Sequence, residues 1–233
     1  MPPQLPFRKT ATAPEATSVS TFRNLYTRVL LGLQAQQHRV IGLTSAIDGE
    51  GKTTIASGLA AALAEDGALL GFGREPDTIL LVECNMGSLP ENPRLGIRPG
   101  PGLVQVLRGE CELDAAIQTT GVERLSVLTL GEPAHNFPLA IRTATLPEVI
   151  AQLRSEFGLV VMDLPAVLNS SDTQVLARLA DQIVLVVRAG VTPAKLVRQA
   201  VDELVDQLGE EMLLGVVLND SRSDLPPWLD NRL

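Results

Sequence analysis

Residues 39–59 read RVIGLTSAIDGEGKTTIASGL and decide the fold of the chain. An apolar run at residues 40–43 is followed by a glycine-rich break, AIDGEGKTT at residues 46–54, and then by a small-residue helical pattern from Thr53. A strand, a glycine-rich loop and a helix in this order are the context that a phosphate-binding loop requires. We therefore predict a nucleotide phosphate site at this loop.

The loop carries the residue types that a polyphosphate site needs. Its relaxed pattern begins at Ala46 and ends with Gly51, Lys52 and Thr53. Gly49 and Gly51 have no Cβ, so backbone N–H groups can surround a phosphate, and the following helix adds its dipole. Lys52 can reach the β- and γ-phosphates, and the Thr53 hydroxyl can bind magnesium. The predicted nucleotide-binding residues are Asp48, Gly49, Glu50, Gly51, Lys52, Thr53 and Thr54.

Lysine is rare in this sequence, which supports the assignment of Lys52. The chain contains only Lys9, Lys52 and Lys195, against sixteen arginines. The alternative is an ordinary glycine turn with a solvated lysine. A lysine that falls at the one position where a phosphate loop requires it, in a chain with so few, favours the nucleotide interpretation.

Length, composition and charge limit the class of protein. The 233 residues, 45% of them hydrophobic, suit one α/β domain with a sizeable core. The net charge of −8 does not favour nucleic acid as a partner. Cys84 and Cys111 match no metal-site spacing and no disulfide framework, as in a reducing cytoplasm. We find no signal peptide and no apolar run near the ~20 residues of a membrane helix, so we expect a cytoplasmic protein that reaches a membrane only through another chain.

Apolar runs and helical periodicities alternate along the chain. We expect strands at residues 40–43, 78–84, 125–130, 159–164, 183–187 and 213–218, and helices at residues 53–66, 103–108, 113–118, 145–157, 172–180 and 193–208. This alternation implies right-handed βαβ units. The predicted fold class is therefore α/β, a P-loop NTPase fold with a doubly wound, mostly parallel sheet and helices on both faces.

The two ends of the chain differ from this central domain. Residues 1–19 are proline-rich without apolar periodicity, so we predict a disordered arm. The domain is expected to span residues 20–220 and to be followed by a loose tail at residues 221–233. Within it, Phe22, Leu25, Val29 and Leu33 predict a helix from Ser20 to about Gln36. This helix either packs on its own domain or meets a neighbouring subunit.

Polar residues follow three of the predicted strands at the edge where ligands bind in parallel sheets. Asp163 ends the apolar run of GLVVMDLP, where its carboxylate can hold magnesium or a magnesium-bound water opposite Thr53; a turn aspartate is the alternative. Glu83 leaves the end of another strand. Asn219 ends the last strand, where its amide could contact a purine or simply form a turn.

Several separated stretches resemble one family. They are GEGKTT (49–54), ILLVECN (79–85), PGLVQVLRGE (101–110), GEPAHNFP (131–138), MDLP (162–165), VVRAGVT (186–192) and LLGVVLN (213–219). Together they resemble the cytoplasmic P-loop domain of the bacterial tyrosine autokinases, which are partners of polysaccharide co-polymerases in capsule and exopolysaccharide export. The resemblance covers about residues 20–219.

The resemblance implies a set of roles. ATP and Mg²⁺ would be the ligands, with Lys52, Glu83 and Asp163 catalytic and with Thr53, Glu83 and Asp163 near the metal. The partner would be an inner-membrane polysaccharide co-polymerase that brings a cytoplasmic protein to the inner membrane. Homo-oligomers would form through the helix at residues 20–36. The function implied is regulation of exopolysaccharide or capsule biosynthesis and export.

The sequence also departs from the family's pattern. After the strand at residues 78–84 the family carries two aspartates and an arginine, where this chain has Glu83, Asn85 and Gly87. The extra methylene of glutamate moves its carboxylate, and a misplacement of ~1 Å can cost about a hundredfold in rate. In the first helix the family's glutamate and second arginine are Ser20 and Tyr26 here. Tyr26 is the only tyrosine, so we expect no autophosphorylation on a tail cluster.

Three functions remain open from the sequence. The first is a diverged autokinase-like ATPase, and the second is a catalytically degraded pseudokinase that serves the export machine as a scaffold. The altered residues after Val82 favour the scaffold, whereas Lys52, Thr53 and Asp163 oppose it. The third is a positioning or partition ATPase, a class that places a lysine where this chain has Ile47.

Overall fold

The computed structural model describes residues 8–9, 25–27, 29, 31, 39–65, 78–85, 95–131 and 145–220. The strands are β1 (Arg8–Lys9), β2 (Val40–Ser45), β3 (Ile79–Glu83), β4 (Ile117–Thr119), β5 (Leu125–Leu128), β6 (Leu159–Asp163), β7 (Gln182–Arg188) and β8 (Leu213–Asn219). The helices are α2 (Lys52–Glu65), α3 (Leu103–Leu107), α4 (Leu113–Ala116), α6 (Thr145–Glu156), α7 (Asp172–Ala177), α8 (Ala194–Leu208) and the 3₁₀ turn η3 (Glu210–Met212).

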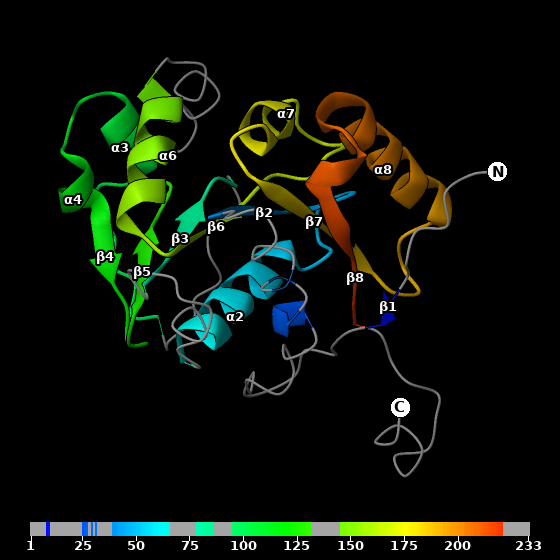
Figure 1. The fold of residues 1–233 in the computed structure, drawn as a ribbon, viewed down its shortest axis with the longest axis horizontal. Helices are drawn as coiled ribbons and strands as arrows, with labels where there is room; N and C mark the ends of the chain where they lie inside the picture. Colours follow the sequence, from blue (N-terminus) through cyan, green and yellow to red (C-terminus); the bar gives the residue numbers. More distant parts are fainter. Residues whose placement is uncertain are drawn as a thin grey trace, which may run out of the picture.

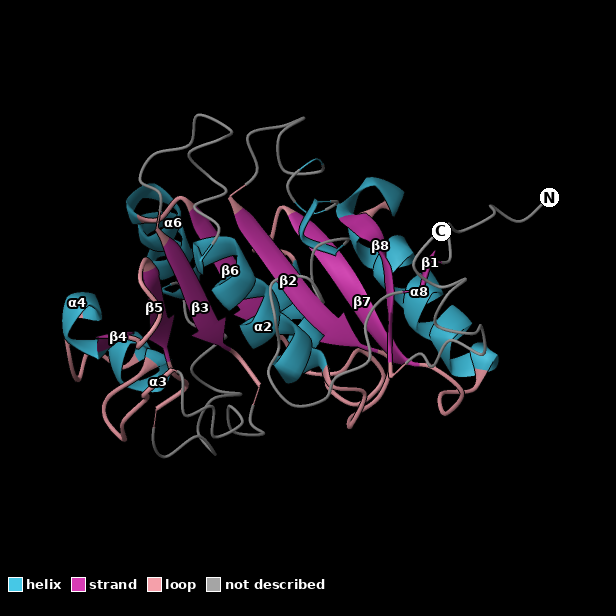
Figure 2. Ribbon diagram, turned by 90° about the horizontal axis from the view of Figure 1, so that it is seen from below, coloured by secondary structure: helices cyan, strands magenta, loops and turns pink. Residues whose placement is uncertain are grey.

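The strands form one sheet with the order β1-β8-β7-β2-β6-β3-β5-β4 (Figure 2). All neighbouring pairs are parallel except β4 and β5, which are antiparallel. The first strand of the phosphate-loop unit, β2, lies in the middle of the sheet between β7 and β6. The predicted α/β class and the mostly parallel sheet are therefore confirmed.

Helices cover both faces of the sheet (Figure 1). Helix α2 packs on one face, whereas α3, α6, α7 and α8 pack on the other. Strand β6 illustrates this burial on both faces, because its residues from Leu159 to Met162 are all apolar. Leu159 and Val161 join the core under α2, and Val160 and Met162 join the core on the opposite face. Continuous apolar strands of this kind are typical of a parallel sheet buried on both faces.

The topology brings three strand ends together at one edge. Strand β6 pairs with β2 on one side and with β3 on the other, and the register places Glu83 beside Asp163. The loop between β2 and α2 begins at the same edge. Because carboxyl ends of parallel strands meet there, the sequence-predicted site residues of all three strands converge.

The predicted elements agree with the structure except at short segments. Residues 117 and 118, predicted to be helical, begin β4, because the chain turns out of α4 at Ile117 with extended φ and ψ angles of −79° and 126°. Residues 178–180, predicted to extend a helix, lie beyond α7. The other boundaries differ by one or two residues, as helix and strand ends commonly do.

Part of the predicted terminal segments lies outside the described residues. Within the segment 1–19, two residues form β1, which pairs parallel with β8; residues 1–7 and 10–19, and the tail 221–233, are not described. Of the predicted helix at residues 20–36, the described residues are helical, and Leu25 and Val29 are buried in the core under α2. None of the helices that can be described is long and apolar enough to cross a membrane.

Candidate functional site

The loop between β2 and α2 requires glycine at two positions. Gly49 and Gly51 have φ angles of +82° and +86°, in the region that residues with a Cβ rarely adopt. A Cβ at Gly51 would also collide with the side-chain amide of Asn219. The backbone can therefore form a tight turn ahead of α2, which is the geometry of a phosphate cradle.

Glu50 holds this loop from inside the protein. Its side chain is buried, and its carboxylate accepts hydrogen bonds from the Ile47 N–H at 2.8 Å, from the Arg188 N–H at 3.2 Å and from the Thr192 hydroxyl. The side chain of Glu50 thus ties the loop to the connection between β7 and α8. Any contact of Glu50 with a nucleotide would have to come from its backbone.

Asn219 supports the same loop from the end of β8. Its Nδ2 donates a hydrogen bond to the backbone carbonyl of Glu50 at 2.9 Å, and the residue is buried. This contact uses one donor of the amide to hold the loop. Contact with a purine base stays a prediction for Asn219.

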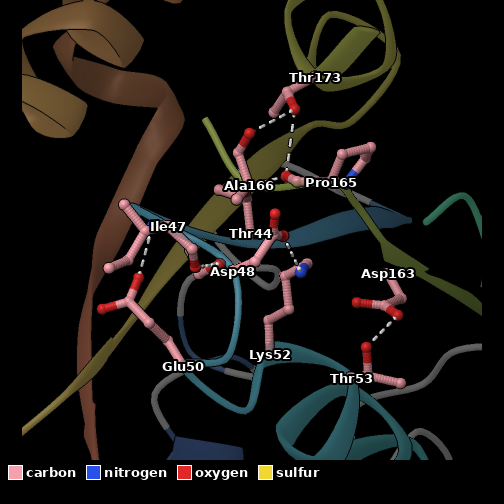
Figure 3. Close-up of polar contacts among 11 residues, drawn as sticks. Thr44, Ile47, Asp48, Glu50, Lys52, Thr53, Asp163, Pro165, Ala166 and Thr173 are labelled. Atoms are coloured by element: carbon pink, nitrogen blue, oxygen red, sulfur yellow. Dashed lines mark hydrogen bonds and ion pairs between the residues drawn. The ribbon is translucent and has the colours of Figure 1, made fainter. Parts of the chain in front are cut away.

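Lys52 begins α2 at the base of the loop (Figure 3). Its side chain is buried, and its Nζ lies 3.4 Å from Oδ1 of Asp48, whose side chain is 64% exposed. Asp48 is the ion-pair partner of this ammonium among the described residues, so donors of Nζ remain for the oxygens of a phosphate. Thr54, in the same first turn of α2, is exposed.

Thr53 and Asp163 meet across the gap between α2 and β6 (Figure 3). The Thr53 hydroxyl donates a hydrogen bond of 2.6 Å to Oδ2 of Asp163, and the Asp163 side chain is fully buried. The other carboxylate oxygen, Oδ1, is also buried and has no hydrogen-bond partner among the described residues. A buried acceptor without a partner is costly, so this oxygen is suited to a ligand or to an ordered water.

The electrostatics of Asp163 reflect this burial. The pKa of Asp163 is raised to about 7, mainly because burial desolvates the carboxylate; the Thr53 hydrogen bond and the Lys52 charge act to lower it, and the nearby Glu83 carboxylate acts to raise it. A carboxylate that is difficult to ionise alone would be stabilised in its charged form by a divalent cation. One hydroxyl and one carboxylate oxygen are hard ligands that suit Mg²⁺, which usually takes its remaining ligands from phosphates and waters.

No larger ligand cluster for a metal is present in the part of the chain that the structure describes. No group of three or more His, Cys, Asp or Glu side chains is arranged there to hold a metal ion. The unpartnered Oδ1 of Asp163, together with the Thr53 hydroxyl, nevertheless fits a magnesium ion that arrives with a nucleotide.

Glu83 lies beside Asp163 but is oriented toward a different neighbour. Its Oε2 accepts a hydrogen bond from the Leu130 N–H at 3.0 Å, and the residue is 6% exposed. The contact ties the end of β3 to the segment after β5. The predicted catalytic and magnesium roles of Glu83 stay predictions, and this geometry gives its carboxylate a structural contact as well.

A cavity of about 560 Å³ opens at the phosphate loop. Its lining residues are Asp48, Gly49, Gly51, Lys52, Thr53, Asn85, Pro165, Ala166, Asn169, Ser170 and Asp172. One wall is the predicted phosphate loop, and the other is formed by Asn85 and the segment after β6. The volume lies within the range of small-molecule sites, so the cavity can hold the phosphates of a nucleotide and a second reactant.

Two functional candidates were missed by the sequence reasoning. Thr192 binds the Glu50 carboxylate although 142 positions separate the two residues, a contact that no local pattern predicts. Asp172 lines the cavity, yet it reads in the sequence only as the start of a helix. The one available signal was the run of polar residues at 169–173, a few residues after a strand that ends at the ligand-binding edge.

Comparisons with known proteins identify relatives of this chain. The succinoglycan biosynthesis transport protein ExoP of Rhizobium meliloti is 32% identical over 222 residues, which is 94% of this chain but 27% of that protein. The tyrosine-protein kinase YwqD of Bacillus subtilis is 25% identical over 91% of this chain and 84% of its own length. This chain thus spans about a quarter of the first relative and most of the second. A scan against models of protein families found no match.

Solved structures with a similar fold include a kinase domain and a cell division ATPase. The crystal structure of the VpsO kinase domain superposes with a TM-score of 0.70 and 29% identity, covering 87% of this chain and 98% of the other. The cell division ATPase MinD of Pyrococcus furiosus gives a TM-score of 0.60 and 26% identity, covering 84% of this chain and 78% of the other. Both matches share the fold, and the first superposes more closely.

Proposed function

Because this chain is a distant member of the family of cytoplasmic kinase domains of the bacterial tyrosine autokinases, we propose that it binds ATP with Mg²⁺ and transfers the γ-phosphoryl group to a hydroxyl or to water. The observation that carries this proposal is the contact between Thr53 and Asp163. It joins the phosphate loop to the end of β6 at the edge of a cavity lined by Lys52.

Each residue of the loop has a separate task in this proposal. The backbone from Asp48 to Gly51 surrounds the phosphates, and Lys52 donates hydrogen bonds to the β- and γ-phosphate oxygens. Thr53 and Asp163 would hold the magnesium ion, which neutralises charge on the phosphates when it is bound. Glu50 and Asn219 hold the conformation of the loop through their hydrogen bonds to its backbone.

We place this activity in exopolysaccharide or capsule export. One relative is named for succinoglycan biosynthesis and transport, and this chain matches about a quarter of its length. Our proposal is that this chain works in the cytoplasm at the inner membrane, bound to a polysaccharide co-polymerase. A nucleotide-dependent change at the loop would then regulate the assembly of the export machine.

A second candidate function is a scaffold that has lost catalysis. It is favoured by the uncharged Asn85 at the cavity and by the hydrogen bond that orients the Glu83 carboxylate toward Leu130. A scaffold would still bind the same membrane partner, and it would either bind ATP without turning it over or bind no nucleotide. The two functions therefore differ in the fate of the γ-phosphate.

Incubation of the purified protein with Mg²⁺ and γ-labelled ATP separates the two functions. The proposed activity predicts label in inorganic phosphate or in protein, at a rate that Lys52→Met abolishes. Bound ATP that remains intact would support the scaffold. Failure to bind ATP at all would contradict the proposed activity and would leave a scaffold that uses no nucleotide.

A further inference from the structure

The segment after β6 is fixed against the start of the phosphate loop. The Val167 N–H donates to the Ser45 carbonyl at 2.8 Å, and the Leu168 N–H donates to the Ala46 carbonyl at 3.1 Å. Through these bonds the segment after β6 lies alongside the end of β2 and the start of the phosphate loop. The segment therefore forms a rigid second wall of the cavity rather than a separate surface loop.

A pair of threonines fastens the same segment at its other end (Figure 3). The Thr44 hydroxyl donates to the Pro165 carbonyl at 2.6 Å, and the Thr173 hydroxyl donates to the carbonyls of Pro165 and Ala166 at 3.1 and 3.3 Å. Thr44 and Thr173 are both buried. The residue that precedes Thr173 is consequently held in one place relative to β2.

That residue is Asp172, which lines the cavity. Asp172 is 7% exposed and is part of the cavity lining, together with Lys52 and Thr53. Its backbone N–H donates to the Ser170 hydroxyl at 3.2 Å, but its carboxylate has no hydrogen bond or ion pair within the described ranges. A carboxylate on a largely buried residue that lines a cavity, with no partner among the described residues, is suited to a polar ligand.

The other carboxylates near the cavity each have an ion-pair or hydrogen-bond partner in the protein. Asp48 lines it but is paired with Lys52 and largely exposed. Asp163 accepts the Thr53 hydrogen bond beneath the loop. Glu83 accepts a hydrogen bond from Leu130 and is not among the lining residues, and its neighbour Asn85, which does line the cavity, carries no charge.

We infer that Asp172 binds and deprotonates the hydroxyl that attacks the γ-phosphate. This inference rests on the proposed function, and it names the residue that acts on the second reactant. The cavity has the phosphate loop on one wall and Asp172 on the other, so a hydroxyl between them would lie between the γ-phosphate and a carboxylate. The sequence analysis expects a catalytic carboxylate at the end of β3, Glu83. In this inference the carboxylate that acts on the hydroxyl is instead Asp172, in the segment after β6.

The chemical step is balanced without a further reactant. The hydroxyl oxygen forms a bond to the γ-phosphorus while the bond from that phosphorus to the β–γ bridging oxygen breaks. The hydroxyl proton passes to the Asp172 carboxylate, and ADP leaves with the bridging oxygen. In phosphoryl transfer most of the catalysis comes from positioning, so the accepted hydrogen bond matters at least as much as the proton transfer.

The test measures affinity and turnover separately in the full chain. Asp172→Asn keeps the size of the side chain, and the backbone bond to Ser170 does not depend on the carboxylate. We expect the dissociation constant for MgATP to stay within about twofold, and turnover to fall by at least about a hundredfold, the usual contribution of a general base. Asp202→Asn, at an exposed position of α8, is the matched control and should change neither.

Asp172→Glu provides a second variant that keeps the charge but moves the carboxylate. It should bind MgATP normally and turn it over more slowly than the unchanged protein, even if the asparagine variant fails to fold. The radioactive product identifies the source of the hydroxyl, since water yields inorganic phosphate and a protein hydroxyl yields labelled protein. Either product supports the inference if the loss of turnover is present.

Two results would overturn the role of Asp172. Normal turnover in Asp172→Asn, in a protein that does turn over ATP, would remove Asp172 from the mechanism and leave the proposed function intact. A loss of MgATP affinity as large as the loss of turnover would make Asp172 a ligand-binding residue instead. If the unchanged protein neither binds nor turns over ATP, the proposed function fails together with this inference.

Discussion

The loop after β2 and the end of β3 lie at the same edge of the sheet, yet they differ in how their polar side chains are used. In the loop, Glu50, Lys52 and Thr53 each have a partner that holds them in place beside the cavity. At the end of β3, Glu83 is hydrogen-bonded to the backbone of Leu130, and the cavity receives the uncharged Asn85.

In the proposed function, the loop after β2 is the phosphate-binding half of the site, and the end of β3 belongs to the half that acts on the second reactant. The half that would bind phosphate retains its glycines, its lysine and its threonine–aspartate contact. The half that would act on the second reactant has the uncharged Asn85 at one strand end, and the buried residue Asp172 lines the cavity from another segment. The predictions below test whether the two regions differ in function as they do in geometry.

The largest effect should follow from Lys52→Met. The variant removes the buried ammonium at the base of the loop while keeping a chain of similar length. Charge-assisted hydrogen bonds to phosphate contribute about 1.5–3 kcal/mol each, so we expect affinity for ATP to fall by about a hundredfold, with thermal stability nearly unchanged. Titration with a fluorescent ATP analogue measures the change. Lys195→Met, at an exposed position of α8, is the control, and equal affinities in the two variants would disprove the assignment.

Asp163→Asn should change the pH dependence of stability in the absence of nucleotide and metal. Burial raises the pKa of Asp163 from 3.8 to about 7, so the folded state binds its proton more tightly than the unfolded state does. Asp163 therefore disfavours folding increasingly as pH rises from about 4 to about 7. The variant should be as stable as the unchanged protein near pH 4 but more stable at pH 8, by on the order of a few kcal/mol.

Urea unfolding at pH 4.5 and pH 8 measures this effect. The same variant should lose the magnesium dependence of ATP binding, because one of the two proposed metal ligands is gone. An Asp163→Asn protein with the pH profile and the magnesium dependence of the unchanged protein would remove Asp163 from the site.

Glu50→Ala tests whether the phosphate loop is fixed in its conformation before ATP binds. The variant leaves the N–H groups of Ile47 and Arg188 and the Thr192 hydroxyl without their acceptor. Unsatisfied buried donors cost about 1–3 kcal/mol, so we expect stability to fall by about 2 kcal/mol and ATP affinity by about tenfold. Denaturant titration and ligand binding measure the two. Glu123→Ala, at an exposed turn, should affect neither, and full affinity in Glu50→Ala would show that the loop needs no such support.

The smallest effect is expected for Glu83→Gln. The glutamine oxygen can still accept the hydrogen bond from Leu130, and the side chain is not part of the cavity lining. We expect ATP affinity and turnover within about threefold of the unchanged protein, in contrast to Asp172→Asn. A loss of turnover above tenfold would restore the catalytic role that the sequence suggests for Glu83 and would remove the contrast between the two regions.

The parts of the site that the sequence predicts are those encoded locally. Lys52 and Thr53 follow from the loop pattern, and Asp163 follows from an apolar strand that ends in a carboxylate and a proline. The fold follows from the same alternation of strands and helices, and the structure confirms it.

The remaining parts depend on contacts between distant positions. The orientation of Glu83 is set by Leu130, 47 positions away, and the packing of Asn219 under the loop is possible only because Gly51 has no Cβ. Asp172 becomes a cavity residue because the segment after β6 is hydrogen-bonded to β2. No periodicity or motif in the sequence predicts these contacts, because each arises from tertiary packing.

The central claim is that the loop after β2, together with Asp163, is a magnesium-dependent ATP site. The most direct measurement is a titration of the 233-residue chain with a fluorescent ATP analogue, once in excess Mg²⁺ and once in a chelator. We expect saturable binding in Mg²⁺ that weakens at least tenfold in the chelator. Absence of saturable binding, or equal affinity in the two conditions, would contradict the claim.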